Sequence, residues 1–319
     1  MHIAVLAGGI GGARFLLGAR AWARAHEADV TAIVNVGDDV TLHGLRICPD
    51  LDSVMYTLGG GSDPERGWGR AGETWTVKEE LAAYGAEPAW FGLGDRDLAT
   101  HLVRTRMLGA GYPLSAVTEA LCARWQPGVR LLPASDDRVE THVVVDHEGQ
   151  ETALHFQEWW IRHRAALPAK RFVFVGAEAA KPAAGVLDAL AEADVVLLAP
   201  SNPVVSIAPI LGIPGLRDAL TAGRAPVVGV SPIIDGAPVR GMADRCLAAI
   251  GVACTAAGVG ALYGSRHDGG LLDAWLVDSS DQDTAVPGVE TRAVPLWMKD
   301  EGATAEMVAT ALAVAGVTR

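Results

Sequence analysis

The first residues with chemical potential form a glycine-rich turn directly after an apolar segment. The turn contains Gly8, Gly9, Gly11 and Gly12 and ends at Arg14. Glycines allow backbone N–H groups to approach a phosphate at the start of a helix, so the turn predicts a phosphate-binding loop. The alternative is a tight strand-to-helix turn that binds no ligand.

This turn differs from two familiar nucleotide-binding loops. The dinucleotide fingerprint is broken, because Arg14 stands five positions after Gly9. The next apolar segment runs into Asn35 and not into an acid that could hold a ribose. A Walker A loop is also absent, since no Gly-Lys-Ser/Thr follows. A dehydrogenase that uses NAD is therefore disfavoured.

Carboxylates follow in three pairs. The pairs are Asp38 and Asp39, Asp50 and Asp52, and Asp95 and Asp97. Hard oxygen ligands grouped in loops at strand ends suit Mg²⁺ that holds a diphosphate. An aspartate near a helix start can instead cap the helix, and this alternative applies most to the third pair. The first two pairs follow the glycine turn closely, so we expect them at the same end of the sheet.

Arginines and two further polar residues accompany these motifs. Arg14, Arg46 and Arg96 lie inside or beside them, and a guanidinium can grip a phosphate or carboxylate with two hydrogen bonds. Ordinary ion pairs with the neighbouring aspartates are the alternative. Ser201 and Asn202 end another apolar segment and open a helix, where they could contact a ligand or cap the helix.

The elements that position these residues alternate along the chain. Apolar segments rich in Val and Ile predict strands at 2–7, 30–36, 129–132, 140–145, 172–175, 195–199, 226–230 and 272–277. Segments of helical period predict helices at 12–25, 182–193, 242–249 and 304–315. This alternation favours an α/β fold with a doubly wound, mainly parallel Rossmann-like sheet and helices on both faces.

Residues 51–125 lack convincing strands. Helices are predicted at 51–58, 74–83, 95–108 and 114–124. We therefore expect residues 1–50 and 126–319 to form the α/β core, and residues 51–125 to form a helical insertion that covers the active site.

Composition excludes several classes of protein. The chain has 319 residues and a formal net charge of −12, which disfavours nucleic acid as a partner. Its four cysteines show no C-x-x-C spacing, so no disulfide framework or zinc ribbon is indicated, and a reducing cytoplasm is expected. Four prolines interrupt the longest uncharged segment, at 195–216, so no membrane span is expected. Single histidines such as His43, His101 and His155 are expected in the core or at the surface and not as ligands.

In chain order, the motifs together resemble the 2-phospho-L-lactate transferase (CofD-like) family, in particular its actinobacterial phosphoenolpyruvyl transferase branch. The matching segments are GGIGGAR at 8–14, NVGDD at 35–39, PDLDSV at 49–54, LGDRDLATH at 93–101, PASDD at 133–137, HFQ at 155–157, PSNP at 200–203 and VSPII at 230–234.

The resemblance implies a Mg²⁺-dependent transferase of coenzyme F-420 biosynthesis, in the class that transfers substituted phosphate groups. A phosphoenolpyruvyl or 2-phospho-L-lactyl group would pass from a guanylylated donor to the ribityl hydroxyl of the deazaflavin Fo, and GMP would leave. Similarity to the actinobacterial branch favours phosphoenolpyruvyl. We also expect a homodimer. Related regulators that bind nucleotide sugars without turnover are the alternative.

Roles can be assigned to the candidate residues on this basis. Donor diphosphate contacts are expected from Gly8, Gly9, Gly11, Gly12, Arg14 and Asn35. Mg²⁺ or the attacking hydroxyl would be held by Asp38, Asp39, Asp50 and Asp52. The residues expected to be catalytic are Asp39, Asp50, Asp52 and Arg96. By resemblance, Asp50 and Arg96 would contact Fo, while Ser201 and Asn202 would border the nucleotide.

Overall fold

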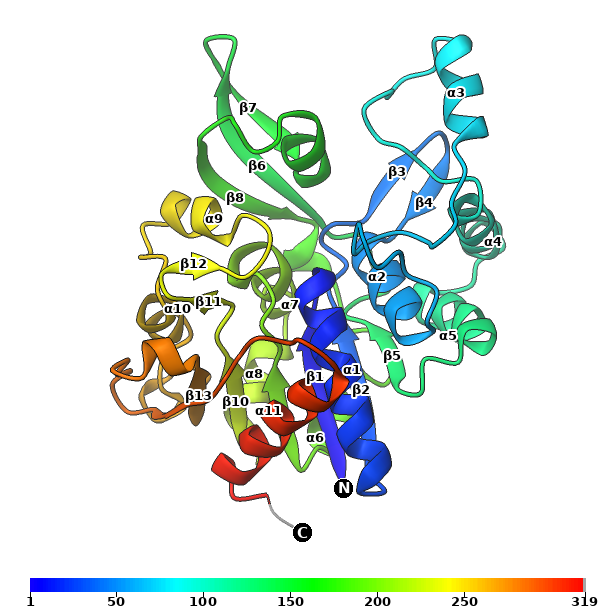
Figure 1. Ribbon diagram of the computed structural model, residues 1–319. Helices are drawn as coiled ribbons and strands as arrows, with labels where there is room; N and C mark the ends of the chain where they lie inside the picture. The colour runs from blue at the N-terminus through cyan, green and yellow to red at the C-terminus, as the bar shows by residue number, and fades with distance from the viewer. Residues whose placement is uncertain (318–319) are drawn as a thin grey trace.

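A seven-stranded parallel sheet forms the centre of the computed structural model, which describes residues 1–317. Its strand order is β14-β13-β10-β9-β1-β2-β5 (Figure 1). The strands are β1 (His2–Ala7), β2 (Asp29–Val34), β5 (Arg130–Pro133), β9 (Val195–Leu198), β10 (Val227–Val230), β13 (Ala274–Val277) and β14 (Glu290–Ala293). The predicted doubly wound, mainly parallel α/β fold is confirmed.

The central strands are apolar because helices cover both of their faces. Every residue of β9, β10 and β13 is buried, which explains their continuous apolar runs. In Figure 1, α1 (Gly9–Ala25) and α11 (Glu301–Val314) lie in front of the sheet, and α6 (Val186–Ala191) and α8 (Leu216–Ala222) lie behind it. The remaining helices of the core are α7 (Ala208–Leu211), α9 (Ala243–Ala249) and α10 (Ala256–Tyr263).

The first and last helices pack with an unusually close approach. A Cβ atom on Gly18 of α1 would lie 2.4 Å from Cγ2 of Thr304 in α11. A larger residue would therefore push the two helices apart. This contact fixes α1, whose first residues belong to the glycine turn.

Two of the predicted strands belong to a second, antiparallel sheet. The predicted strands at 140–145 and 172–175 do not join the parallel sheet. They form β6 (Glu140–His147) and β8 (Ala169–Val175), with β7 (Gln150–His155) on the other side of β6. The exposed positions along β8 show that one face of this sheet meets solvent, as antiparallel sheets allow.

Residues 40–125 lie on the side opposite the antiparallel sheet (Figure 1). Residues 40–47 and 76–83 extend beyond the carboxyl ends of the parallel strands, whereas residues 49–58 and 114–125 pack beside α1 and β5. This region contains the hairpin of β3 (Val40–Leu42) and β4 (Leu45–Ile47), followed by α2 (Pro49–Leu58), α3 (Thr76–Ala83), α4 (Asp97–Gly109) and α5 (Leu114–Trp125). Each of these helices overlaps a predicted one. The division of the chain into a core and an insertion over the active site stays a prediction.

No single helix within residues 1–317 is long and apolar enough to cross a membrane. Pro203–Leu211 and Leu216–Ala222 meet the length and composition requirement only as a pair, and this pair is bent by 85°.

Candidate active site

The glycine turn lies where the strand order reverses, between β1 and β9, which is where open α/β sheets bind ligands. The hydroxyl of Ser201 donates to the carbonyl oxygen of Gly8 at 2.8 Å and accepts from the Gly8 N–H at 3.1 Å. A Cβ atom on Gly11 would lie 2.5 Å from the carbonyl oxygen of Pro200. The turn is therefore packed directly onto the segment after β9, and glycine permits that approach.

A carboxylate occupies the start of α1. Gly9 begins the helix with φ +62°, a conformation that favours glycine. Its backbone N–H donates to the side chain of Asp50, which comes from the first turn of α2. A helix N-terminus favours an anion at this position. The expected proximity of Asp50 to the glycine turn is thus observed.

Asn35 joins Asp38 and Asp50 into one acidic pair. Its Nδ2 donates to Oδ2 of Asp50 at 2.9 Å and lies 3.4 Å from Oδ1 of Asp38. Nε2 of Gln157 lies 3.5 Å from the other oxygen of Asp38. Asp38 is 6% exposed and Asp50 is 5% exposed, and neither has an ion-pair partner in the described part of the chain. The negative charge of this acidic pair is therefore uncompensated.

Burial shifts the acidity of both members. Burial and the nearby charge of Asp50 raise the pKa of Asp38 well above its ordinary value. Burial raises the pKa of Asp50 to about 6, although hydrogen bonds from Asn35 and Gly9 oppose the shift. Two oxygen donors that lack a counter-charge suit a hard divalent cation, so the acidic pair could hold Mg²⁺.

The other two predicted carboxylates already have cationic partners. Asp39 is fully buried and pairs with Nη2 of Arg46 at 3.0 Å. Burial raises the pKa of Asp39 to about 6, and the Arg46 guanidinium opposes that shift. Asp52 pairs with the buried guanidinium of Arg104. The four aspartates therefore divide into two that are compensated and two that are not.

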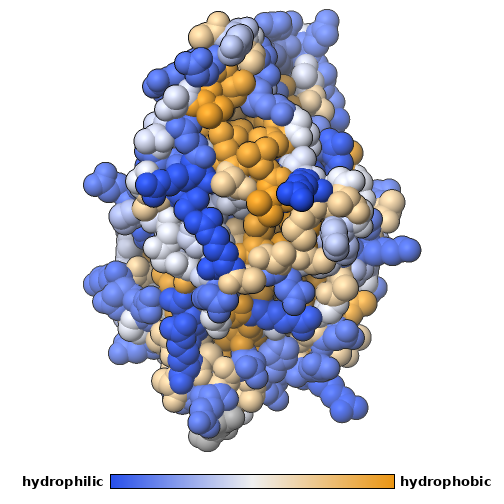
Figure 2. Space-filling model, turned by 90° about the vertical axis from the view of Figure 1, so that its right-hand side faces the viewer, coloured by the Kyte–Doolittle hydropathy of each residue, from blue (hydrophilic) through white to orange (hydrophobic). Residues whose placement is uncertain are grey.

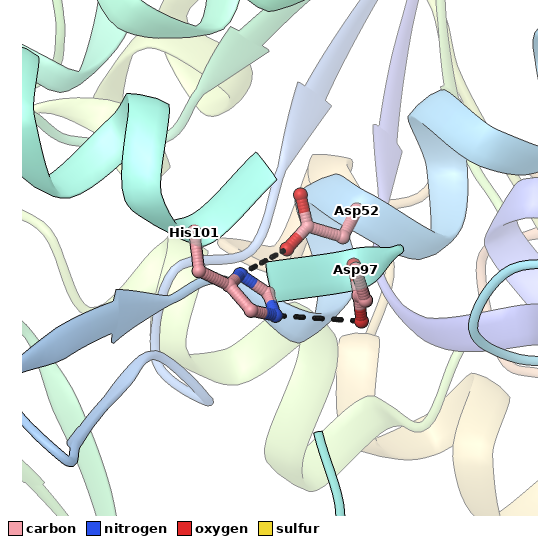
Figure 3. Close-up of side chains that lie close together, drawn as sticks. All are labelled: Asp52, Asp97 and His101. Atoms are coloured by element: carbon pink, nitrogen blue, oxygen red, sulfur yellow. Dashed lines mark ion pairs between the residues drawn. The ribbon is translucent and has the colours of Figure 1, made fainter. Parts of the chain in front are cut away.

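Asp52 also belongs to a cluster with Asp97 and His101 (Figure 3). The imidazole lies between the carboxylates, with Nδ1 3.8 Å from Asp52 and Nε2 3.3 Å from Asp97. By residue type and spacing, the three could bind a metal. Nη1 of Arg104 lies 3.1 Å from the same Nδ1, so ion pairing and hydrogen bonding also account for this arrangement.

The sequence analysis missed Arg104 and underrated His101. His101 is buried, as expected, but it contacts two carboxylates. The available signal was the helical spacing of Asp97, His101 and Arg104, which places three charged or titratable side chains on one face of α4. Nothing in the sequence pairs Arg104 with Asp52, which precedes it by 52 residues.

Several predicted residues have visible structural roles. Asp95 accepts from the backbone N–H groups of Thr76 and Val77, both at 3.0 Å, so it caps the start of α3. Oδ1 of Asn202 accepts from Val204 and Val205, which caps the segment Pro203–Ile207. Asn202 thus caps the segment it precedes, whereas Asp95 caps α3 and not α4, the helix that it precedes. A ligand contact of Ser201 or Asn202 stays a prediction.

Two predicted arginines are exposed. Arg14 lies in the second turn of α1, and Arg96 precedes α4. The Arg96 guanidinium lies beside Gly72, and no ion pair of either arginine is present among residues 1–317. Neither guanidinium compensates the buried aspartates, so both remain available to an acidic ligand.

Known proteins of one family are similar to this chain over almost its whole length. The family model described as 2-phospho-L-lactate transferase CofD matches residues 3–312. A phosphoenolpyruvate transferase of Nocardia farcinica is 64% identical, covering 99% of this chain and 95% of the relative. The phosphoenolpyruvate transferase of Thermobifida fusca is 63% identical, with 99% and 98% covered.

A solved structure supports the fold independently. A Bacillus halodurans protein described as a member of the UPF0052 family superposes with a TM-score of 0.61 and 20% identity, covering 98% of this chain and 99% of the other. At that identity the likeness shows a shared fold.

Replacing an uncompensated carboxylate and replacing a compensated one should change the free energy of unfolding in opposite directions. Without divalent cations at pH 7.5, Asp50→Asn should raise the free energy of unfolding by about 1–2 kcal/mol, because the folded protein must ionise a group whose pKa is raised. Asp52→Asn should lower it by about 3 kcal/mol, because the buried Arg104 loses its partner. Urea denaturation with a chelator present measures both.

The pH dependence of the Asp50→Asn effect provides a control. The pKa of Asp50 is about 6 in the folded protein and 3.8 ordinarily. The free energy of unfolding of the wild type should therefore fall as the pH rises from about 4 to about 6. The advantage of the variant should therefore appear across this interval and level off above it. A variant less stable than wild type at pH 7.5 would contradict the uncompensated pair.

Proposed function

Because the chain belongs to the 2-phospho-L-lactate transferase CofD family, we propose that it transfers a phosphoenolpyruvyl group from a guanylylated donor to the ribityl hydroxyl of the deazaflavin Fo, in coenzyme F-420 biosynthesis. The name phosphoenolpyruvate transferase, carried by relatives such as that of Mycolicibacterium smegmatis at 60% identity, supports this donor over 2-phospho-L-lactate. The observation in the site that carries the proposal is the acidic pair beside the glycine turn.

Mg²⁺ would be held by the acidic pair, Asp38 and Asp50. This set is narrower than the four carboxylates expected from the sequence, because Asp39 and Asp52 already pair with guanidinium groups. When bound, Mg²⁺ supplies positive charge that neutralises the donor diphosphate. Oxygen ligands alone, in a pair without its own counter-charge, are what such a cation requires.

The residues of the chain would mainly bind and orient the reactants. The start of α1, where the Gly9 N–H donates to Asp50, would lie beside the donor diphosphate. The ribityl oxygen forms a bond to the phosphorus of the phospho acid, the bond from that phosphorus to the bridging oxygen breaks, and GMP leaves. A carboxylate oxygen of Asp50 that is not bound to Mg²⁺ would receive the hydroxyl proton. Arg14 and Arg96 are available for the carboxylate of the donor.

Incubation of the protein with Fo, Mg²⁺ and an equal mixture of the two guanylylated donors tests the reaction. We expect GMP and mainly the unsaturated phosphoenolpyruvyl product, identified by mass. A pocket separates ligands that differ by two hydrogens by roughly tenfold to two-hundredfold, so some lactyl product is also expected. A predominantly lactyl product would refute the donor, and binding without turnover would favour a nucleotide-binding regulator.

Asp50→Asn should lower the transfer rate on the order of a hundredfold, because one positioned electrostatic group at the reacting phosphate is lost. Excess Mg²⁺ should restore only part of the rate, since the ligand itself is missing. Asp95→Asn is a matched control, because this half-buried aspartate caps α3, lies outside the acidic pair and should leave transfer nearly unchanged. Steady-state rates over a range of Mg²⁺ concentrations decide the outcome, and near-normal turnover by Asp50→Asn would refute its role.

A homodimer is also proposed, and the surface favours one. Figure 2 shows a band of apolar surface on the side that carries α3 to α5 in Figure 1. Exposed apolar residues of these helices include Val77, Leu102 and Val103. A second copy would cover them. Sedimentation should give twice the 33.2 kDa of one chain, and Leu102→Glu should shift the particle to the monomer mass; a wild-type monomer at micromolar concentration would refute the proposal.

A further inference from the structure

The segment between α2 and α3, residues 59–75, forms a glycine-rich strap. Its glycines are Gly59, Gly60, Gly61, Gly67, Gly69 and Gly72. The strap folds back on itself, with a bridge between Ser62 and Arg70 and a hydrogen bond from the N–H of Asp63 to the carbonyl oxygen of Gly69. On the side of α4, Nη1 of Arg70 donates to the carbonyl oxygen of Arg96 at 2.8 Å.

One arginine joins the strap to the other side of the molecule. Arg240, between β12 (Ala237–Pro238) and α9, donates from Nη2 to the carbonyl oxygen of Arg66. Within residues 1–317, this is the one hydrogen bond from the strap to any residue beyond 126. Arg240 has no ion-pair partner in that range, so this contact accounts for the position of its guanidinium.

The strap is shaped to receive this guanidinium. Gly67 has φ +74°, and a Cβ atom there would lie 2.4 Å from Nη1 of Arg240. A side chain at residue 67 would therefore displace Arg240, and the backbone conformation would be strained for any residue other than glycine. Arg240 thus contacts the strap in two ways, by a hydrogen bond to Arg66 and by packing against the backbone of Gly67.

In Figure 1, the contact joins parts of the chain on either side of the start of α1, namely α2, from which the strap leaves, and β12, which precedes Arg240. Asp50 lies in the first turn of α2, and the strap leaves the last residue of that helix. A Cβ atom on Gly241 would lie 3.7 Å from the ring of Trp160, and Trp160 follows Gln157, which lies beside Asp38. Arg240 therefore links the helix that carries Asp50 to the segment that contacts Asp38.

We propose that Arg240 is a positioning residue that holds the strap across the acidic pair, so that the activated phosphorus is attacked by the acceptor hydroxyl and not by water. This inference rests on the proposed transfer. In the competing reaction a water oxygen bonds to the same phosphorus, the same bond to GMP breaks, and the free phospho acid is released. Closure of a site excludes water, and glycines at the ends of the strap permit opening for substrate entry.

Three variants separate this role from a general loss of structure. Arg240→Ala removes the contact, whereas Arg240→Lys keeps a cation that can still donate to Arg66. Arg245→Ala is the matched control, because Arg245 is also exposed and donates to a distant backbone carbonyl, that of Ala165, away from the strap. Hydrogen exchange of residues 60–72 reports closure of the strap without any need for activity.

The expected results are specific to Arg240. Exchange of residues 60–72 should be about tenfold faster in Arg240→Ala, as the loss of one hydrogen bond to an ionised donor implies, with partial rescue by lysine and no change in Arg245→Ala. The ratio of donor hydrolysis to transfer, measured as GMP released against deazaflavin product formed, should rise by about the same factor.

Each other outcome has a definite meaning. Unchanged exchange in Arg240→Ala would overturn the inference. Faster exchange with an unchanged ratio of hydrolysis to transfer would also overturn it, because the strap would then not control water. If the wild-type protein gives no transfer at all, the proposed function fails, and the exchange measurement still decides whether Arg240 holds the strap.

Discussion

Four aspartates are buried at the carboxyl edge of the parallel sheet, and the unfavourable energy of burying negative charge explains much of the structure around them. Two of them are neutralised by Arg46 and Arg104. Among residues 1–317, the acidic pair receives only amide hydrogen bonds, from the side chains of Asn35 and Gln157 and the backbone of Gly9. Electrostatic strain is therefore concentrated at the two carboxylates next to the glycine turn, where a bound cation relieves it.

The region between β3 and α5 is tied to the site through the same charges. Arg104 of α4 donates to the carbonyl oxygen of Arg46 at 3.3 Å, and the neighbouring Thr105 accepts from the Arg46 N–H at 2.8 Å. The helix thus holds both backbone groups of the arginine that neutralises Asp39. Separating α4 from α2 would leave the buried Asp52 without its guanidinium partner and would release the backbone of Arg46, so the electrostatics of the site require both parts of the chain.

The sequence predicted the parts of the site that depend on local pattern. An apolar strand followed by glycines indicates β1 and the turn, and the continuous runs of β9 and β10 indicate strands covered on both faces. It could not separate Asp38 from Asp39, which are adjacent and chemically identical. Their difference arises from the neighbours that the fold places beside each side chain, Asp50 beside Asp38 and Arg46 beside Asp39. The antiparallel sheet was not predicted for a related reason, since an apolar segment does not indicate which strand it pairs with.

The close contact between Gly18 and Thr304 has a consequence for biosynthesis. The helix that starts at the glycine turn leaves the ribosome before six of the seven strands of the parallel sheet, and α11, which covers it, is synthesised after all of them. Until α11 has been made, α1 therefore exposes an apolar surface whose native partner does not yet exist. A nascent chain of this kind depends on chaperones longer than one whose early elements cover each other, and a prematurely terminated chain that lacks α11 would be a substrate for proteolysis.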